Sequence, residues 1–136
     1  MRVLLDTNVV LDHLLDRKPF SEQAASIFSA IEKGTATGIL GATTVTTIHY
    51  LVAKTLGQAA AIDTIKQLLR LFEVAPINHL VLSSALDRST KDFEDAVLME
   101  AGFHAGANAI VTRDHQGFLK SPVPVFSPQD FLKLIE

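Results

Sequence analysis

Three aspartates stand at the ends of predicted secondary-structure elements. Asp6 follows the apolar run 3–5. Asp114 comes just after the apolar run 109–112, and Asp95 lies in the first turn of a predicted helix. Taken singly, each has an ordinary explanation as a helix N-cap, a turn residue or an acid at a helix N-terminus. Taken together, they suggest one site, because carboxylates that converge without a matching Lys or Arg repel one another unless a cation lies among them.

A hard divalent cation, Mg²⁺ or Mn²⁺, is the natural partner for such a group of carboxylates. These ions prefer oxygen ligands and usually bind through a few carboxylates, water and substrate phosphate. A bound ion of this kind can activate water and neutralise charge on a phosphodiester during its displacement. We therefore predict a metal-dependent hydrolase in which Asp6, Asp95 and Asp114 are the catalytic and metal-binding residues.

The secondary-structure elements that position these aspartates are expected to be alternating strands and helices. Short runs rich in Val, Ile and Leu alternate with longer amphipathic segments, as in parallel strands covered by helices on both faces. Five strands are predicted, at residues 2–6, 37–42, 72–75, 109–112 and 123–126. Seven helices are predicted, at residues 7–15, 21–33, 43–56, 58–71, 78–87, 92–104 and from 127 onward, with caps that include Ser21, Thr43 or Thr44, and Ser127. The expected fold is α/β, with a doubly wound, parallel, five-stranded sheet in a single domain over residues 1–136.

The expected topology also predicts where the site lies. Open parallel sheets bind ligands outside the carboxyl ends of their strands, where the direction of winding reverses. The first and fourth strands can be neighbours at that point, which brings Asp6 and Asp114 into one crevice. The helix that carries Asp95 then lies beside them.

Composition sets further limits on function. The chain has 136 residues, no Cys, and 12 Lys and Arg against 15 Asp and Glu. The absence of Cys excludes disulfides, thiolate zinc sites and Cys nucleophiles, and makes a cytoplasmic location the expectation. No stretch approaches the roughly 20 apolar residues of a membrane span. The net charge of −3 argues against a general polyanion binder, so any contact with nucleic acid is expected to be local.

Three motifs, in order, resemble those of the PIN-domain family, which includes VapC-type toxins. They are VLLDTNV at 3–9, DAVLMEA at 95–101 and IVTRD at 110–114, and the similarity extends over nearly the whole chain. The resemblance implies a metal-dependent endoribonuclease fold whose acidic pocket holds Mg²⁺ or Mn²⁺. It also implies an RNA substrate, a homodimer and an antitoxin protein as a possible partner.

The same resemblance assigns roles to individual residues. Asp6, Asp95 and Asp114 match the family's metal-site acids. Thr112 and Asn8 match positions that orient the site by hydrogen bonds.

His49 departs from the family pattern, because it falls where similar proteins commonly carry a Glu. Its helical spacing puts it on one face with Val45 and Val52, so we expect the imidazole to point into the fold or the cleft. An imidazole adds no negative charge and suits Mg²⁺ less well than oxygen does. His49 is then a hydrogen-bonded residue of the cleft or a ligand for a softer ion such as Mn²⁺.

Because His49 stands where a Glu is expected, two points stay open: which residue supplies the fourth carboxylate, and whether the protein is an enzyme. Asp92 or Glu94 could supply the missing carboxylate, since Asp92 stands one helical turn before Asp95. The alternative to an enzyme is a catalytically weakened PIN-like module that serves in binding or assembly.

Two weaker features bear on partners. Basic residues in loops and at helix ends could contact RNA phosphates: Arg17, Lys18, Arg88, Lys91, Arg113 and Lys120. An apolar series in the two helices over 43–71 favours a dimer or antitoxin surface: Leu51, Leu56, Ile62, Ile65, Leu68 and Leu69.

Overall fold

A computed structural model describes residues 1–88 and 91–136, and its centre is one parallel β-sheet. The strands are β1 (Arg2–Leu5), β2 (Thr37–Gly41), β3 (Glu73–Ala75), β4 (Ala109–Val111) and β5 (Val125–Phe126). They lie in the order β3-β2-β1-β4-β5, and every neighbouring pair is parallel. The predicted doubly wound, five-stranded sheet is confirmed, although β5 begins later than expected.

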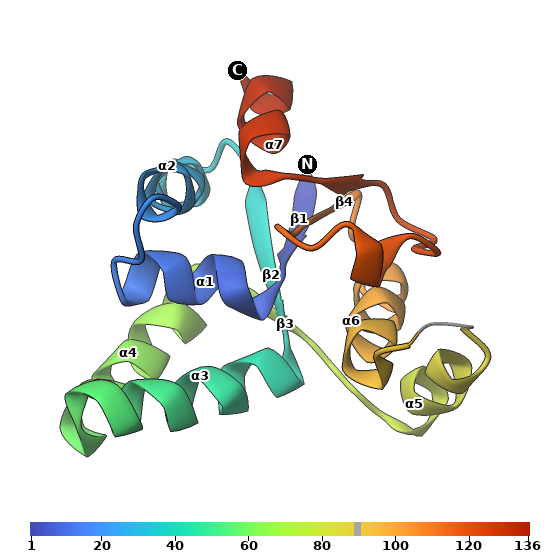
Figure 1. Ribbon diagram of the computed structural model, residues 1–136, viewed down its shortest axis with the longest axis horizontal. Helices are drawn as coiled ribbons and strands as arrows, with labels where there is room; N and C mark the ends of the chain where they lie inside the picture. The colour runs from blue at the N-terminus through green and yellow to red at the C-terminus, as the bar shows by residue number, and fades with distance from the viewer. Residues whose placement is uncertain (89–90) are drawn as a thin grey trace.

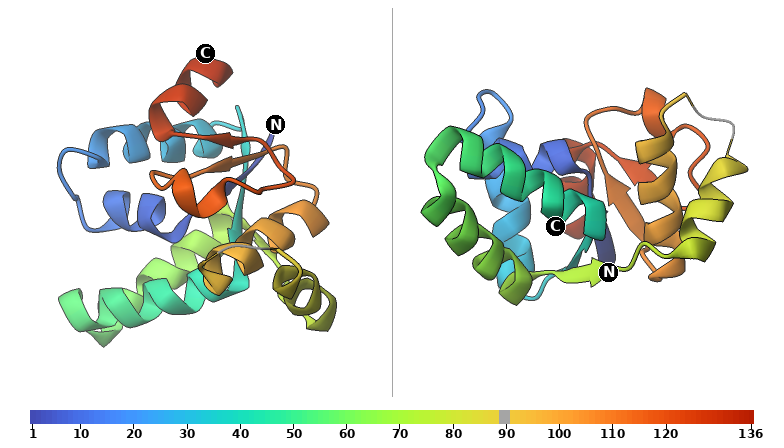
Figure 2. Two further views of the ribbon diagram at one scale, coloured as in Figure 1. Left: turned by 45° about the vertical axis from the view of Figure 1, so that its right-hand side comes forward. Right: turned by 90° about the horizontal axis from the view of Figure 1, so that it is seen from below.

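Helices cover both faces of the sheet (Figures 1 and 2). They are α1 (Thr7–Leu14), α2 (Ser21–Glu32), α3 (Ala42–Leu56), α4 (Gln58–Leu71), α5 (His79–Leu86), α6 (Phe93–His104) and α7 (Pro128–Ile135). Helices α1 to α4 lie on one side of the sheet, and α5 and α6 lie on the other. A short 3₁₀ helix, η1 (Gln116–Phe118), follows β4 and was not predicted. Within the described residues, no helix is long and apolar enough to cross a membrane.

The alternation of side chains along β1 explains why the protein has a core on each side of the sheet. Val3 and Leu5 belong to a cluster with residues of α1 to α4 and α7, whereas Leu4 packs with α5 and α6. All three side chains are fully buried. Successive residues of a strand point to opposite faces, so an unbroken apolar run fits a strand covered on both sides.

The helix caps agree only in part with expectation. Ser127 accepts a hydrogen bond from the Asp130 N–H at 3.1 Å and caps α7 as predicted. The cap predicted at Thr43 or Thr44 is wrong, because α3 already begins at Ala42, directly after β2. Ser21 is likewise the first residue of α2 and makes no capping hydrogen bond.

The carboxyl ends of β1 and β4 lie next to each other. Leu5 pairs with Val111 in the sheet, and the backbone N–H of Asp6 donates to the Val111 carbonyl at 2.9 Å. The segment that follows β1 and the loop that follows β4 are therefore held side by side. This confirms the predicted position of the reversal of winding.

Candidate active site

Thr112 connects the segments that carry two of the predicted site aspartates. Its side chain is fully buried, and its Oγ1 donates a hydrogen bond to Asp6 Oδ2 at 2.8 Å. The same oxygen accepts the backbone N–H of Asp114 at 2.9 Å. Asp6 itself is only 6% exposed. One hydroxyl group therefore fixes the direction of the Asp6 carboxylate and the path of the chain at Asp114.

Asn8, also expected to orient the site, contacts a different group. It is exposed, and its carbonyl oxygen and Oδ1 accept from Arg17 Nη2 at 3.3 and 3.5 Å. Within the part of the chain that the structure describes, Asn8 makes no hydrogen bond to a site aspartate.

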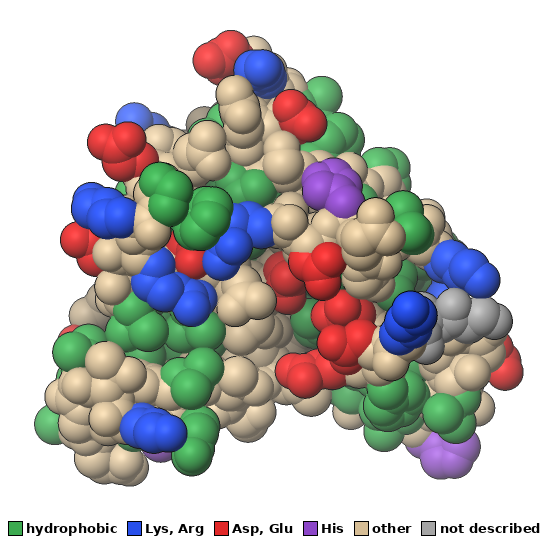
Figure 3. Space-filling view, viewed as in Figure 1, with side chains coloured by type: hydrophobic (Ala, Val, Ile, Leu, Met, Phe, Trp, Pro, Cys, Tyr) green, Lys and Arg blue, Asp and Glu red, His purple; other side chains and the backbone are tan. Residues whose placement is uncertain are grey.

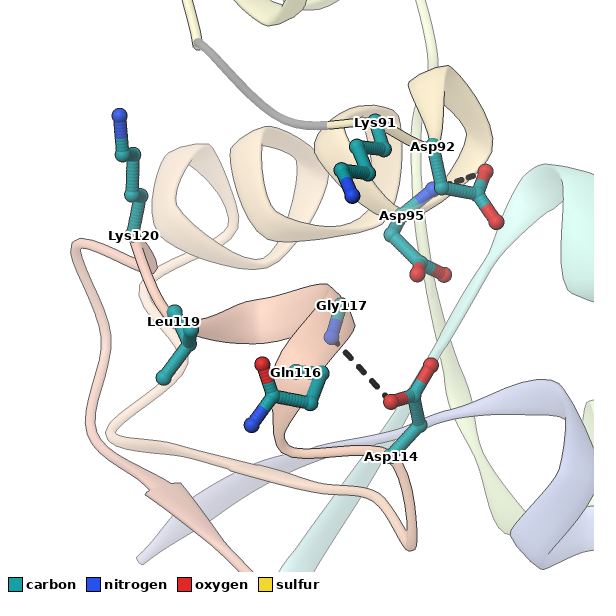
Figure 4. A pocket seen from close by; sticks show the side chains of 8 residues that line it. All are labelled: Lys91, Asp92, Asp95, Asp114, Gln116, Gly117, Leu119 and Lys120. Carbon is teal, nitrogen blue, oxygen red and sulfur yellow. Dashed lines mark hydrogen bonds between the residues drawn. The ribbon is translucent and has the colours of Figure 1, made fainter.

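Asp95 and Asp114 line the same pocket, which has a volume of about 390 Å³ (Figure 4). The lining residues come from the start of α6, the loop after β4, η1 and the segment after η1: Lys91, Asp92, Asp95, Asp114, Gln116, Gly117, Leu119 and Lys120. The carboxyl groups of Asp95 and Asp114 extend into it from opposite walls. The topology thus brings together two acids that are 19 positions apart in the sequence.

Gly117 provides the space in which these two carboxylates lie. Its N–H donates to Asp114 Oδ1 at 3.2 Å. A Cβ atom at this position would collide with Asp95 Oδ2 and would lie 2.9 Å from Asp114 Oδ2. With a side chain at this position, the two carboxylates would have to move aside. This role could not be predicted from the sequence, because a glycine in the loop that follows Asp114 indicates by itself only a turn.

The first turn of α6 adds two more carboxylates. Asp92 caps the helix, because its Oδ1 accepts from the N–H groups of Glu94 at 2.9 Å and Asp95 at 3.3 Å. Asp92 also lines the pocket, whereas Glu94 is exposed beside it. Both residues proposed as the fourth acid therefore lie near Asp95.

The proximity of these acids changes the protonation of Asp95. Burial raises the pKa of Asp95 to about 7, and the charges of Asp92, Asp6, Asp114 and Glu94 contribute to the rise. At neutral pH the carboxyl group is therefore divided between its neutral and ionised forms. Burial together with several like charges is the environment expected of a functional carboxylate.

Asp6 experiences the same field in a more buried position. Burial raises the pKa of Asp6, the hydrogen bond from Thr112 opposes this rise, and the charges of Asp114 and Glu94 add to it. Acidic side chains form a continuous group on this face of the molecule (Figure 3). Among residues 1–88 and 91–136, no Lys or Arg forms an ion pair with Asp6, Asp95 or Asp114.

The three aspartates fit a hard cation in their chemistry. All their donor atoms are carboxylate oxygens, and their negative charge has no ion-paired counter-charge in the described residues. In the same residues, no three His, Asp or Glu side chains are already arranged as ligands of one ion. A cation here would need water or substrate to complete its coordination, as Mg²⁺ usually does.

His49 shares a face of α3 with Val52, which is buried, and with Val45, which packs against the core, as its spacing predicts. The buried residues of α3 are Thr44, Ile48 and Val52, and His49 lies half-buried at the edge of that face. It stands seven residues after Ala42, about 10 Å along the helix from its first residue. It does not line the acidic pocket. Thr44 is the α3 residue that reaches toward α1, where its Oγ1 lies 2.9 Å from Thr7 Oγ1.

Comparisons with known proteins agree with this architecture. A family model described as PIN domain matches residues 2–116. Ribonuclease VapC1 from Aquifex aeolicus (strain VF5) is 24% identical over 138 residues, covering 96% of this chain and 92% of the relative. The solved structure of FitAcB from Neisseria gonorrhoeae has a TM-score of 0.68 and 23% identity, covering 93% of this chain and 98% of that chain. VapC20 from Mycobacterium tuberculosis, described as a sarcin–ricin loop cleaving toxin, has a TM-score of 0.67 and 12% identity, covering 86% and 93%. Because the family model spans most of the sequence and the structural matches share its fold, the chain belongs to the PIN domain family.

Proposed function

We propose that this protein is a metal-dependent endoribonuclease that hydrolyses RNA phosphodiester bonds, with Asp6, Asp95 and Asp114 holding Mg²⁺ or Mn²⁺. The observation that carries this proposal is that Asp6 and Asp114 follow the adjacent ends of β1 and β4, while Asp95 of α6 faces Asp114 across one pocket. In the described residues none of the three has an ion-paired counter-charge. The Aquifex relative is a ribonuclease by name, which supports the reaction class. VapC20 is described as cleaving the sarcin–ricin loop, which supports RNA as the substrate.

The metal, when bound, would activate water and neutralise charge that develops on the phosphate. The protein's own residues prepare the site. Thr112 holds the Asp6 carboxylate in one orientation, and Gly117 leaves room for Asp95 and Asp114. Asp95 must release its proton to serve a cation, so its pKa of about 7 makes proton and metal compete near neutral pH.

We further propose that the protein is the toxin of a toxin–antitoxin pair, forms a homodimer and is cytoplasmic. Solved structures with the same fold include a toxin–antitoxin complex from Klebsiella pneumoniae. The α3–α4 pair presents exposed apolar side chains that a protein partner would cover: Tyr50, Leu56, Ile62 and Leu69. Leu68 of the same predicted apolar series is buried in the core.

RNA cleavage by the purified protein distinguishes an enzyme from the weakened binding module. Labelled single-stranded RNA is incubated with protein in Mg²⁺, Mn²⁺ or EDTA, and native and denaturing gels report bound and cut RNA separately. We expect new, shorter RNA fragments with either ion and intact RNA in EDTA. RNA that is bound but never cut would favour the binding or assembly module.

A further inference from the structure

We propose that Arg17 and Arg113, both held by the buried carboxylate of Asp12, form a binding site for an RNA phosphate beside the acidic pocket. This inference rests on the proposed function in one respect, namely that the substrate is RNA. The site belongs to the loop between α1 and α2 and to the loop after β4, outside the acidic group itself. Arg113 lies between Thr112 and Asp114 in the sequence, so the two sites share a loop.

Asp12 is the anchor of this arrangement. It belongs to α1, and its side chain is only 1% exposed. Arg113 binds both of its oxygens, with Nε at 2.7 Å from Oδ2 and Nη2 at 3.2 Å from Oδ1. Arg17 Nε lies 3.2 Å from Oδ1 as an ion pair, without the alignment of a hydrogen bond.

Two guanidinium groups share one carboxylate, so the cluster has an excess positive charge. The buried Asp12 requires one arginine to compensate it, and the second arginine is not needed for charge neutrality. The side chains of Arg17 and Arg113 are 39% and 30% exposed, so both reach the surface of the protein. The Asp12–Arg17–Arg113 cluster can therefore attract an anion, although the net charge of the whole chain is −3.

The orientation of Arg113 is fixed before any ligand arrives. Its guanidinium lies over the ring of Phe20, with Cζ 3.8 Å from the ring centroid. Together with the two-point contact to Asp12, this stacking restrains the plane of the group. Within the described residues, Nη1 of Arg113 makes no hydrogen bond and can donate to a ligand. A guanidinium held in this way loses little freedom when it binds a phosphate.

Position on the surface also favours a phosphate of the substrate. Figure 3 shows Lys and Arg side chains beside the acidic group on the same face of the molecule. The acidic pocket repels RNA, whose phosphates are negative, so a substrate needs a cationic contact close by. Arg113 is the residue directly before Asp114, so the loop that carries this arginine also carries an acid of the pocket.

The test measures RNA binding in EDTA, so that no RNA is cut and cleavage does not affect the result. Fluorescence anisotropy of a labelled single-stranded RNA gives the affinity at several salt concentrations. We expect Arg17→Ala to weaken binding by roughly tenfold. The slope of log affinity against log salt should fall by about 0.7, the value for one lost phosphate contact on a single strand. Arg70→Ala, at the end of α4, is the matched control because it removes the same charge outside the cluster.

Two further variants distinguish an ordered site from general charge. Arg113→Lys keeps the charge but loses the two-point contact, so we expect weaker binding. Asp12→Asn makes the protein more positive by one charge, and general attraction would then strengthen RNA binding. An ordered site predicts that it weakens binding, because both arginines lose their anchor. Thermal melts identify any variant that fails to fold. If Asp12→Asn, at a buried residue, fails to fold, then Arg17→Ala, at a partly exposed residue, tests the phosphate site instead.

The phosphate site would be overturned if Arg17→Ala and Arg113→Lys both bind RNA with the same affinity and the same salt dependence as Arg70→Ala. That outcome leaves the nuclease proposal intact if the wild-type protein cuts RNA in Mn²⁺. Conversely, arginine-dependent binding by a protein that never cuts RNA would support the phosphate site and contradict the nuclease.

Discussion

Thr112 Oγ1 donates a hydrogen bond to Asp6 Oδ2 at 2.8 Å while it accepts the N–H of Asp114 at 2.9 Å. The hydroxyl is fully buried, so water cannot replace either contact. It connects the segment after β1 with the loop after β4, where the two strands end side by side. The geometry of the acidic site therefore depends on a neutral residue that would itself bind no metal.

Replacing Thr112 with Val should damage the site although the two side chains have nearly the same shape. Asp6 loses the hydrogen bond that lowers its pKa, and the Asp114 N–H loses its acceptor. We expect a loss of about 1–3 kcal/mol in the free energy of unfolding, measured by urea denaturation. Thr112→Ser keeps the hydroxyl group and should retain most of the wild-type free energy of unfolding. Equal stability of Thr112→Val and wild type would mean that the hydrogen bonds contribute little.

The raised pKa of Asp95 predicts how stability depends on pH. Its pKa rises from 3.8, the ordinary value, to about 7 in the fold, so the folded state binds the proton more tightly than the unfolded chain. The resulting stabilisation is fully present below about pH 4 and is lost as pH rises through 7. Asp95→Asn should therefore be more stable than wild type at pH 8, by about 1–2 kcal/mol after allowance for solvent screening. The difference should disappear at low pH, and chemical denaturation across the pH range measures it.

An increase in the melting temperature would report cation binding without any substrate. Millimolar Mg²⁺ or Mn²⁺ should raise the melting temperature, because a ligand that binds only the folded state stabilises it. The gain should be smaller at pH 6 than at pH 8, since protonated Asp95 competes with the ion. Asp6→Asn should abolish the gain, whereas Asp63→Asn, on exposed α4, should keep it. An equal gain in both variants would show that the ion binds elsewhere.

Two glycine substitutions distinguish site geometry from general packing. Gly117→Ala places a methyl group against Asp95 and Asp114, so the carboxylates must turn away, and we expect metal-dependent stabilisation to be lost. Gly102→Ala, in α6, meets Leu4 at 3.6 Å, an ordinary contact, and should be neutral or stabilising. Differential scanning fluorimetry with and without Mn²⁺ measures both. Normal metal stabilisation in Gly117→Ala would show that the two acids are not needed in their present positions.

The sheet could be predicted from the sequence because both of its faces are buried. Each strand is then an apolar run, and the predicted neighbourhood of β1 and β4 placed Asp6 and Asp114 at one edge. That these acids bind metal stays a prediction. The 3₁₀ helix at Gly117 was not predicted, since its three residues carry no periodic pattern.

Two features could not be read from local pattern. The buried face of α3 includes Thr44, a polar residue whose hydroxyl contacts that of Thr7, and the apolar pattern of the helix did not predict this contact. The role of Asp12 was also missed, because its partner Arg113 stands 101 residues away. In both cases a polar side chain is buried beside a partner from a distant segment, and helical spacing carries no information about such a partner.

The most direct measurement is the rate of RNA cleavage in Mn²⁺ by the wild-type protein and by three single variants, Asp6→Asn, Asp95→Asn and Asp114→Asn. Each variant is purified in parallel with Asp63→Asn, which controls for the same substitution outside the site. We predict that each of the three lowers the rate by about 100-fold or more while RNA binding in EDTA persists, and that Asp63→Asn cuts at the wild-type rate. Cleavage at the wild-type rate by Asp95→Asn would contradict the assignment of the acidic group as the catalytic site.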